Sequence, residues 1–197
     1  EGPGHLPDLS MVSPVYHEGR PIVLAASTAH HVDMGGFAPG SMPFGVTEIY
    51  QEGLQVPPTR LMRAGRMDEG ILKLINQNVR TRHEVRGDLM AQYAAAKIAE
   101  QRVADLLGRA EVDQVIRYTH EILDHAERCM RAGIEQLPDG TYHFEDYMDT
   151  DGATGNPVKI AMTAHKAGSD IEFDFTGSDA QVPGAVNCVM TVTVSSV

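Results

Sequence analysis

The sequence predicts an α+β fold: mixed strands and loops at the start, a central antiparallel helical hairpin, and antiparallel β-strands at the end. Three observations predict it. Residues 1–60 are rich in Gly, Pro and His, residues 66–137 carry helical periodicity, and residues 138–197 alternate with period two. The 197 residues suit one domain or two small ones. Because the chain begins with Glu and ends in a β-like run, we expect it to be a fragment of a larger protein.

Two short strands are expected in the first segment, over Val12–Tyr16 and Ile22–Ala26, with a tight turn at Glu18 and Gly19. The second run is continuously apolar, which favours a strand buried on both faces. Residues 35–45 contain four glycines and two prolines and predict a long irregular loop.

Three helices are expected in the middle segment. Asp68 can cap the first, which runs to about residue 79, and the others span about 84–107 and 112–137. Ala94, Ala95, Ala96 and Ala99 give the second a small-residue surface. Since the connection at 108–111 is short, we expect these two helices to pack as an antiparallel hairpin.

The alternation in the last segment predicts antiparallel strands, each with one face toward solvent. They cover residues 141–147, 158–162 and 171–175, with a turn over 149–157 between the first two. The Thr/Val-rich run at 190–197 is also expected to be a strand.

Composition restricts the class of partner. The chain has 27 acidic against 16 basic side chains, a net charge of -11, which disfavours nucleic acid and an anionic membrane surface. The longest apolar run is Ile22–Ala26, far short of the roughly 20 residues that span a bilayer. Cys129 and Cys188 are expected to be buried free thiols in a reducing compartment, so we expect a cytoplasmic protein.

The most informative pattern is a repeated His-x-x-Asp unit. His5-Leu-Pro-Asp8 recurs 25 residues later as His30-His-Val-Asp33. Imidazole and carboxylate are ligands that suit Zn²⁺, Mn²⁺ or Fe²⁺, and the strand pair between the units can bring them together. We therefore predict a divalent metal site built from His5, Asp8, His30 and Asp33. The alternative is two unrelated loops with surface His and Asp side chains.

Two neighbouring features complete the first segment. His31 points away from His30 if the segment is extended, which suits a donor behind the ligands or a substrate contact. The glycine-rich loop at 35–45 allows close backbone approach to a ligand, but it matches no phosphate-binding motif. If ATP takes part, this chain does not show where it binds.

A set of motifs extends along the chain: Gly4-His-Leu-Pro-Asp8, Ala29-His-His-Val-Asp33, Gly35-Gly36, Pro39-Gly-Ser-Met42, Thr47-Glu-Ile-Tyr-Gln-Glu-Gly53, Asn78-Val-Arg80, Arg86-Gly-Asp-Leu89, Ala91-Gln92, Leu137-Pro-Asp-Gly-Thr-Tyr142 and Asp174-Phe-Thr-Gly177. In their order and spacing, across essentially the whole chain, these motifs resemble the hydantoinase B/oxoprolinase family.

The resemblance implies an enzyme component that works with an A-type partner. In the family the partner uses ATP to phosphorylate the substrate, and the B-type subunit completes the reaction at a divalent metal. The resemblance implies His5, Asp8 and His30 as ligands, Asp33 as a further one, and another Asp from a segment before residue 1. It implies a hetero-oligomer.

The expected reaction is ATP-dependent opening of a cyclic amide, such as 5-oxoproline, a hydantoin or a related lactam. A metal would polarise the reacting carbon and activate a water molecule. Glu48, close after the glycine-rich loop, is the candidate for proton transfer, and His31 is the second catalytic candidate. Two alternatives stay open: an ATP-dependent ketone carboxylase of the same family, and a non-catalytic assembly fragment.

Overall fold

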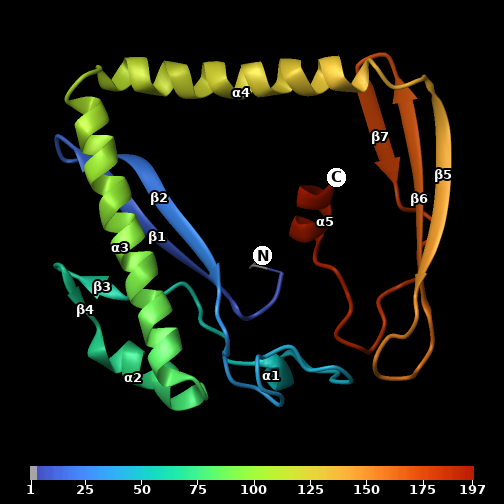
Figure 1. Ribbon diagram of the computed structural model, residues 1–197, viewed down its shortest axis with the longest axis horizontal. Coiled ribbons are helices and arrows are strands. Elements are labelled where there is room, and N and C mark those ends of the chain that lie inside the picture. The colour runs from blue at the N-terminus through green and yellow to red at the C-terminus, as the bar shows by residue number, and fades with distance from the viewer. Residues whose placement is uncertain (1–3) are drawn as a thin grey trace.

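The first part of the fold is a long β-hairpin. The computed structural model describes residues 4–197, and it opens with antiparallel strands β1 (Asp8–His17) and β2 (Arg20–His30) (Figure 1). Glu18 and Gly19 join them with φ angles of 49° and 79°, the left-handed pair that a two-residue hairpin turn requires. Both predicted strands and the turn are confirmed. The register pairs Asp8 with His30 at the open end of the hairpin.

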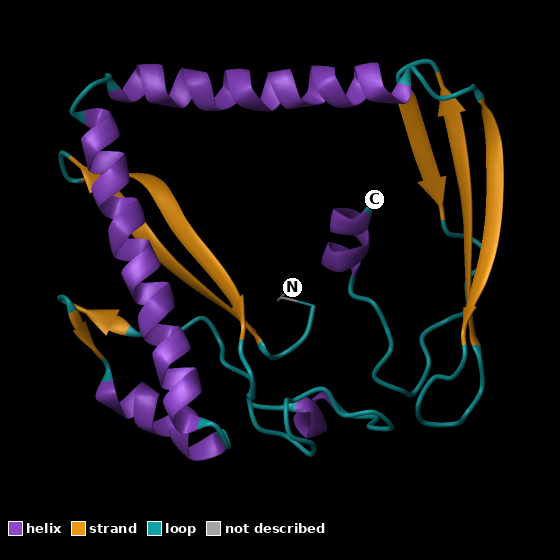
Figure 2. Ribbon diagram, viewed as in Figure 1, coloured by secondary structure: helices purple, strands orange, loops and turns teal. Residues whose placement is uncertain are grey.

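The expectation that the apolar run in β2 is buried on both faces is wrong. Burial alternates along the strand, and Leu24 is 66% exposed. The reason is that helix α3 (Arg82–Leu107) packs against β1 and β2 from one side, while within the described residues the other side of the hairpin stays open (Figure 2).

The main apolar core lies beside this hairpin. Asp68 accepts hydrogen bonds from the backbone N–H groups of Gly70 and Ile71 and so caps helix α2 (Glu69–Asn78), as predicted. Helix α2 packs against α3. Three shorter elements precede them: α1 (Ile49–Glu52), β3 (Met62–Arg63) and β4 (Arg66–Met67). The buried cluster consists of Met34, Leu72, Ile75, Val79, Val85 and Leu89.

The predicted antiparallel hairpin of helices is wrong, although both helices exist. Helix α4 (Val112–Ile134) leaves α3 at a sharp bend and runs alone toward the last sheet (Figure 1). The buried face of α3 is already occupied by the β-hairpin and α2. Within the described chain, none of the α4 residues is buried, and Ile122, Leu123 and Met130 are more than 60% exposed.

The last part is a three-stranded antiparallel sheet in the order β5-β6-β7. Its strands are β5 (Gly140–Met148), β6 (Val158–Ala167) and β7 (Asp170–Asp174), which confirms the three predicted strands. The prediction of one buried face is wrong for β5, because every residue of this strand is exposed. The C-terminal end of α4 lies against this sheet, where Arg131 Nη1 and Asp170 Oδ1 are 2.6 Å apart. In the part of the chain described here, no helix combines the length and apolar character needed to cross a membrane.

The expected strand at the end of the chain is a helix instead, α5 (Met190–Ser196). Thr193 N–H donates to the Val189 carbonyl, and the Ser196 hydroxyl donates to the Val192 carbonyl. These local bonds satisfy the backbone without a neighbouring strand. Helical spacing places Val189 and Val192 on one face, and Val192 lies close against Gly4.

Candidate metal centre

Three predicted ligands meet at the open end of the β-hairpin. Asp8 begins β1 and His30 ends β2, directly opposite each other, while His5 lies one turn before the strand. His30 Nδ1 lies 3.0 Å from Asp8 Oδ1 and 3.0 Å from His5 Nε2, and His5 Nε2 lies 2.9 Å from Asp8 Oδ1. The three donor atoms therefore form a nearly equilateral triangle.

This triangle has the chemistry and the size of a divalent metal site. Two imidazole nitrogens and one carboxylate oxygen are a ligand set for Zn²⁺, Mn²⁺ and Fe²⁺. Around an octahedral ion with bonds of about 2.1 Å, neighbouring ligand atoms lie about 3.0 Å apart. The spacings in this group match that value. The residues present therefore fit such an ion.

The group is also open to solvent on one side. The side chains of His5, Asp8 and His30 are 34%, 27% and 49% exposed. A structural metal site is closed by protein ligands, whereas a catalytic site keeps positions free for water or substrate. In this chain the three side chains leave one side of the group accessible in that way.

Asp33, the fourth predicted ligand, is not brought to this group. Its carboxylate is 1% exposed and accepts four hydrogen bonds, from the backbone N–H groups of Gly35, Gly40 and Arg80 and from Arg80 Nη1. Burial raises the pKa of the Asp33 carboxyl, but the donors from Arg80, Gly40 and Gly35 outweigh it and hold the pKa below its usual value. Asp33 is thus an anchor for the following loop.

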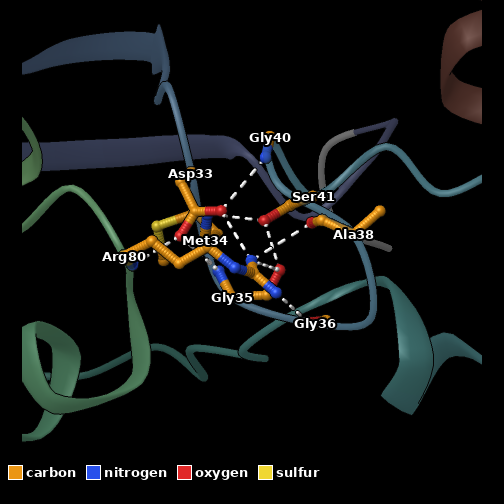
Figure 3. Close-up of polar contacts among 8 residues, drawn as sticks. All are labelled: Asp33, Met34, Gly35, Gly36, Ala38, Gly40, Ser41 and Arg80. Atoms are coloured by element: carbon orange, nitrogen blue, oxygen red, sulfur yellow. Dashed lines mark hydrogen bonds and ion pairs between the residues drawn. The ribbon is translucent and has the colours of Figure 1, made fainter.

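Asp33 and Arg80 together shape the glycine-rich loop (Figure 3). The Arg80 guanidinium donates to the carbonyls of Gly35, Gly36 and Ala38, at 3.3, 2.7 and 3.1 Å. Ser41 adds a second clamp, since its hydroxyl accepts from Met34 N–H and donates to the Gly35 carbonyl. These bonds fix an irregular segment that has no strand partner of its own.

His31 faces the interior, as alternation along a strand requires. It is fully buried, and its Nε2 lies 3.1 Å from Gln92 Oε1 on α3. Gln92 Nε2 in turn donates to the carbonyls of Leu9 in β1 and Ser27 in β2. The structure therefore places His31 in the interior beside α3 and outside the group of His5, Asp8 and His30, and its catalytic role stays a prediction.

Glu48, the other predicted catalytic residue, is an exposed residue directly before α1. Its backbone N–H donates to Gln51 Oε1 at 3.1 Å, which helps to start that short helix. The structure does not include Glu48 in the group of His5, Asp8 and His30, and its role in proton transfer stays a prediction.

Sequence reasoning missed the roles of Gln92, Arg80 and Ser41. Gln92 carried a usable signal, because it is a polar residue at helical spacing between the buried Leu89 and Ala96. Arg80 and Ser41 lie in two of the motifs quoted above, Asn78-Val-Arg80 and Pro39-Gly-Ser-Met42, but neither motif indicates a partner. Asp33, which Arg80 contacts, is 47 residues away in the sequence.

Sequence comparison identifies the family to which this chain belongs. All of residues 1–197 match the hydantoinase B/oxoprolinase family, and the chain belongs to that family. The putative B-type component of a D-/L-hydantoinase from a Pseudomonas species is 33% identical over 92% of this chain and 31% of that protein. The beta component of caprolactamase from Pseudomonas jessenii is 32% identical over 98% of this chain and 33% of that protein.

Two solved structures share the fold. The ATP-dependent caprolactamase of Pseudomonas jessenii superposes with a TM-score of 0.83 and 33% identity, covering 91% of this chain and 31% of that chain. A nucleotide-free acetone carboxylase superposes with a TM-score of 0.81, but its 18% identity shows likeness of fold alone. The chain spans about a third of the length of these relatives.

Proposed function

We propose that this chain is the metal-bearing part of a B-type subunit in an ATP-dependent enzyme that opens a cyclic amide. One observation carries the proposal: His5, Asp8 and His30 converge within 3.0 Å of one another at the open end of the hairpin. The hydantoinase and caprolactamase relatives named above support the class of reaction.

The proposed chemistry divides between the metal and the chain. A bound divalent ion would polarise the activated amide carbon and lower the pKa of a water molecule. His5, His30 and Asp8 would hold that ion, with one negative charge among the three ligands. Their exposed side leaves room for the substrate, and the hairpin, fastened by Gln92 to α3, keeps the three donor atoms in register.

A partner subunit would bind and use the ATP. The relatives are described as subunits of larger enzymes, and the glycine-rich loop here is held by Asp33 and Arg80 through its own backbone. We propose an A-type subunit, in a hetero-oligomer, that transfers a phosphoryl group from ATP to the amide oxygen and releases ADP. Addition of water at the same carbon then breaks the ring C–N bond and releases inorganic phosphate. Amide hydrolysis is preferred over ketone carboxylation because the two relatives named above that are more than 30% identical to this chain, the hydantoinase and the caprolactamase, are named for cyclic amides.

The test is ring opening by the reconstituted enzyme. The full-length subunit with its ATP-using partner should open a lactam or hydantoin only when ATP and Mn²⁺ or Zn²⁺ are present. His30→Ala should lower the rate by at least about 100-fold, because it removes one of the metal ligands. His17→Ala, at the other end of β1, is the matched control and should keep the wild-type rate. Equal rates in His30→Ala and wild type would refute the proposal.

A further inference from the structure

A pocket of about 370 Å³ lies between the metal ligands and the end of the chain. His5 and Asp8 line one side. Residues 184–192, which we call the C-terminal wall, lie on the other side, and residues 185–189 and Val192 of this wall line the pocket. The two sides are about 180 residues apart in the sequence, and no sequence pattern on one side indicates that the other side lies next to it. Cys188 belongs to this wall and is exposed, as Cys129 is on α4, so the expectation of buried thiols is wrong for both.

The C-terminal wall is held in a defined shape by one side chain. Asn187 Nδ2 donates to the carbonyls of Val182 and Gly184 at 2.8 and 2.7 Å, and its Oδ1 accepts from Val182 N–H at 2.9 Å. All three bonds are made within five residues of Asn187. A surface preformed in this way loses little conformational freedom when a ligand binds.

Close contacts also fix where the wall lies. A Cβ atom on Gly184 would fall 1.6 Å from the Asp151 carbonyl oxygen, so the backbone of the wall presses directly on the 149–157 loop. That loop is itself rigid, since the buried Asp151 carboxylate accepts bonds from Ala153, Thr154 and Gly155. On the opposite side a Cβ on Gly4 would lie 2.8 Å from Val192 Cγ2.

The chemistry of the wall is aliphatic. Ala185, Val186, Val189 and Val192 line the pocket opposite the ligands. Such a surface suits methylene groups, each of which gains about 0.8 kcal/mol on leaving water. The pocket therefore has a polar side, at His5 and Asp8, and an aliphatic side. A cyclic amide matches both sides, with a polar carbonyl at one end of the ring and CH₂ groups at the other.

We infer that this pocket holds the ring of a small neutral cyclic amide, with its carbonyl toward His5 and Asp8 and its methylenes on the C-terminal wall. The inference rests on the proposed function and narrows its substrate class. A ring that carries a carboxylate and keeps its amide toward His5 and Asp8 would place the charge against the methyl groups of the wall, which is unfavourable. In the described part of the lining, Asp8 is the one acidic or basic side chain apart from His5.

The experiment compares matched substrates that differ by one carboxylate. The full-length subunit and its ATP-using partner are assayed with 2-pyrrolidinone against 5-oxoproline, and with hydantoin against hydantoin-5-acetate. For each pair that is turned over, kcat/KM should favour the neutral ring by about tenfold or more. Ala185→Arg adds a cation to the exposed wall and should shift the ratio toward the acid by about tenfold. Ala180→Arg, exposed and outside the pocket lining, is the control and should leave it unchanged.

Metal content is measured on every sample to separate the two claims. Metal retention with ring opening, but with the acid preferred by the wild-type enzyme, would overturn the inference and leave the proposed function standing. An unchanged ratio in a folded, metal-loaded Ala185→Arg enzyme would do the same. Failure of the wild-type enzyme to open any of the four rings with ATP would overturn the proposed function and the inference with it.

Discussion

Asp8 and Asp33 end the same sequence unit, His-x-x-Asp, yet they do different things. Asp8 lies at the start of a strand with part of its carboxylate open to solvent, beside His5 and His30. Asp33 follows the end of β2, where the chain turns inward and four N–H bonds use both carboxylate oxygens. The motif therefore predicts which residue types are present, and the path of the backbone decides which of them converge in one group.

The Asp33–Arg80 pair gives a prediction about stability and pH. Asp33→Asn should lower the free energy of unfolding by about 2–4 kcal/mol at pH 7, since the amide turns an NH₂ group toward other donors. The pKa of Asp33 is lowered in the folded state, so its contribution is complete above the ordinary value of 3.8 and is lost as the pH falls through the lowered value.

The difference between wild type and Asp33→Asn should thus be constant above about pH 5 and shrink below pH 4. Urea unfolding of both proteins in the presence of a chelator, at several pH values, measures it. Other carboxyls with lowered pKa values, such as Asp139 and Asp151, affect both proteins equally and cancel. A difference that grows on acidification would contradict the assigned role of Asp33.

At the scale of elements, α3 is the support on which the candidate site depends. Its buried face presents Val85, Leu89, Gln92 and Ala96, and Gln92 joins it to both strands of the hairpin. The periodicity of the sequence predicted this helix well. It did not predict the partner, because an apolar stripe indicates that a face is buried and not what buries it.

Neighbouring alanines on α3 test this packing. Ala96 is 4% exposed and lies one turn from Gln92 on the face toward the β-hairpin, whereas Ala95 is exposed. Ala96→Leu should overpack that interface and destabilise the protein by about 1–3 kcal/mol. Ala95→Leu should change stability by less than about 0.5 kcal/mol. Chemical denaturation of both variants measures the difference, and equal midpoints would show that this face of α3 is not packed.

On the scale of the whole molecule, α4 shows the limit of prediction from sequence: its extent was predicted, and its direction was not. Strands, turns and helix limits follow from local patterns, and most of them were predicted within a few residues. The helical hairpin was wrong because loop length alone does not fix direction: α4 crosses to the last sheet and leaves its apolar residues exposed (Figure 1). The prediction of a strand over residues 190–197 was wrong because Thr and Val favour strands only where a partner strand exists.

The part of the candidate site that is built from residues close together in the sequence was predicted, and the part built from distant residues was not. His5, Asp8 and His30 follow from two motifs joined by a hairpin whose turn is visible in the sequence. The C-terminal wall lies about 180 residues away in the sequence and faces His5 and Asp8 across the pocket. No pattern in one sequence encodes a contact of that range.

Metal content of the full-length subunit tests the central claim most directly. Elemental analysis after dialysis against Zn²⁺, Mn²⁺ or Fe²⁺ should give about one ion per chain for the wild-type protein and for His17→Ala. The His5→Ala/His30→Ala double variant should lose the ion while its circular dichroism spectrum stays unchanged, since both side chains are partly exposed. Full metal retention in the folded double variant, or no metal in the wild-type protein, would contradict the assignment of His5, Asp8 and His30 as ligands.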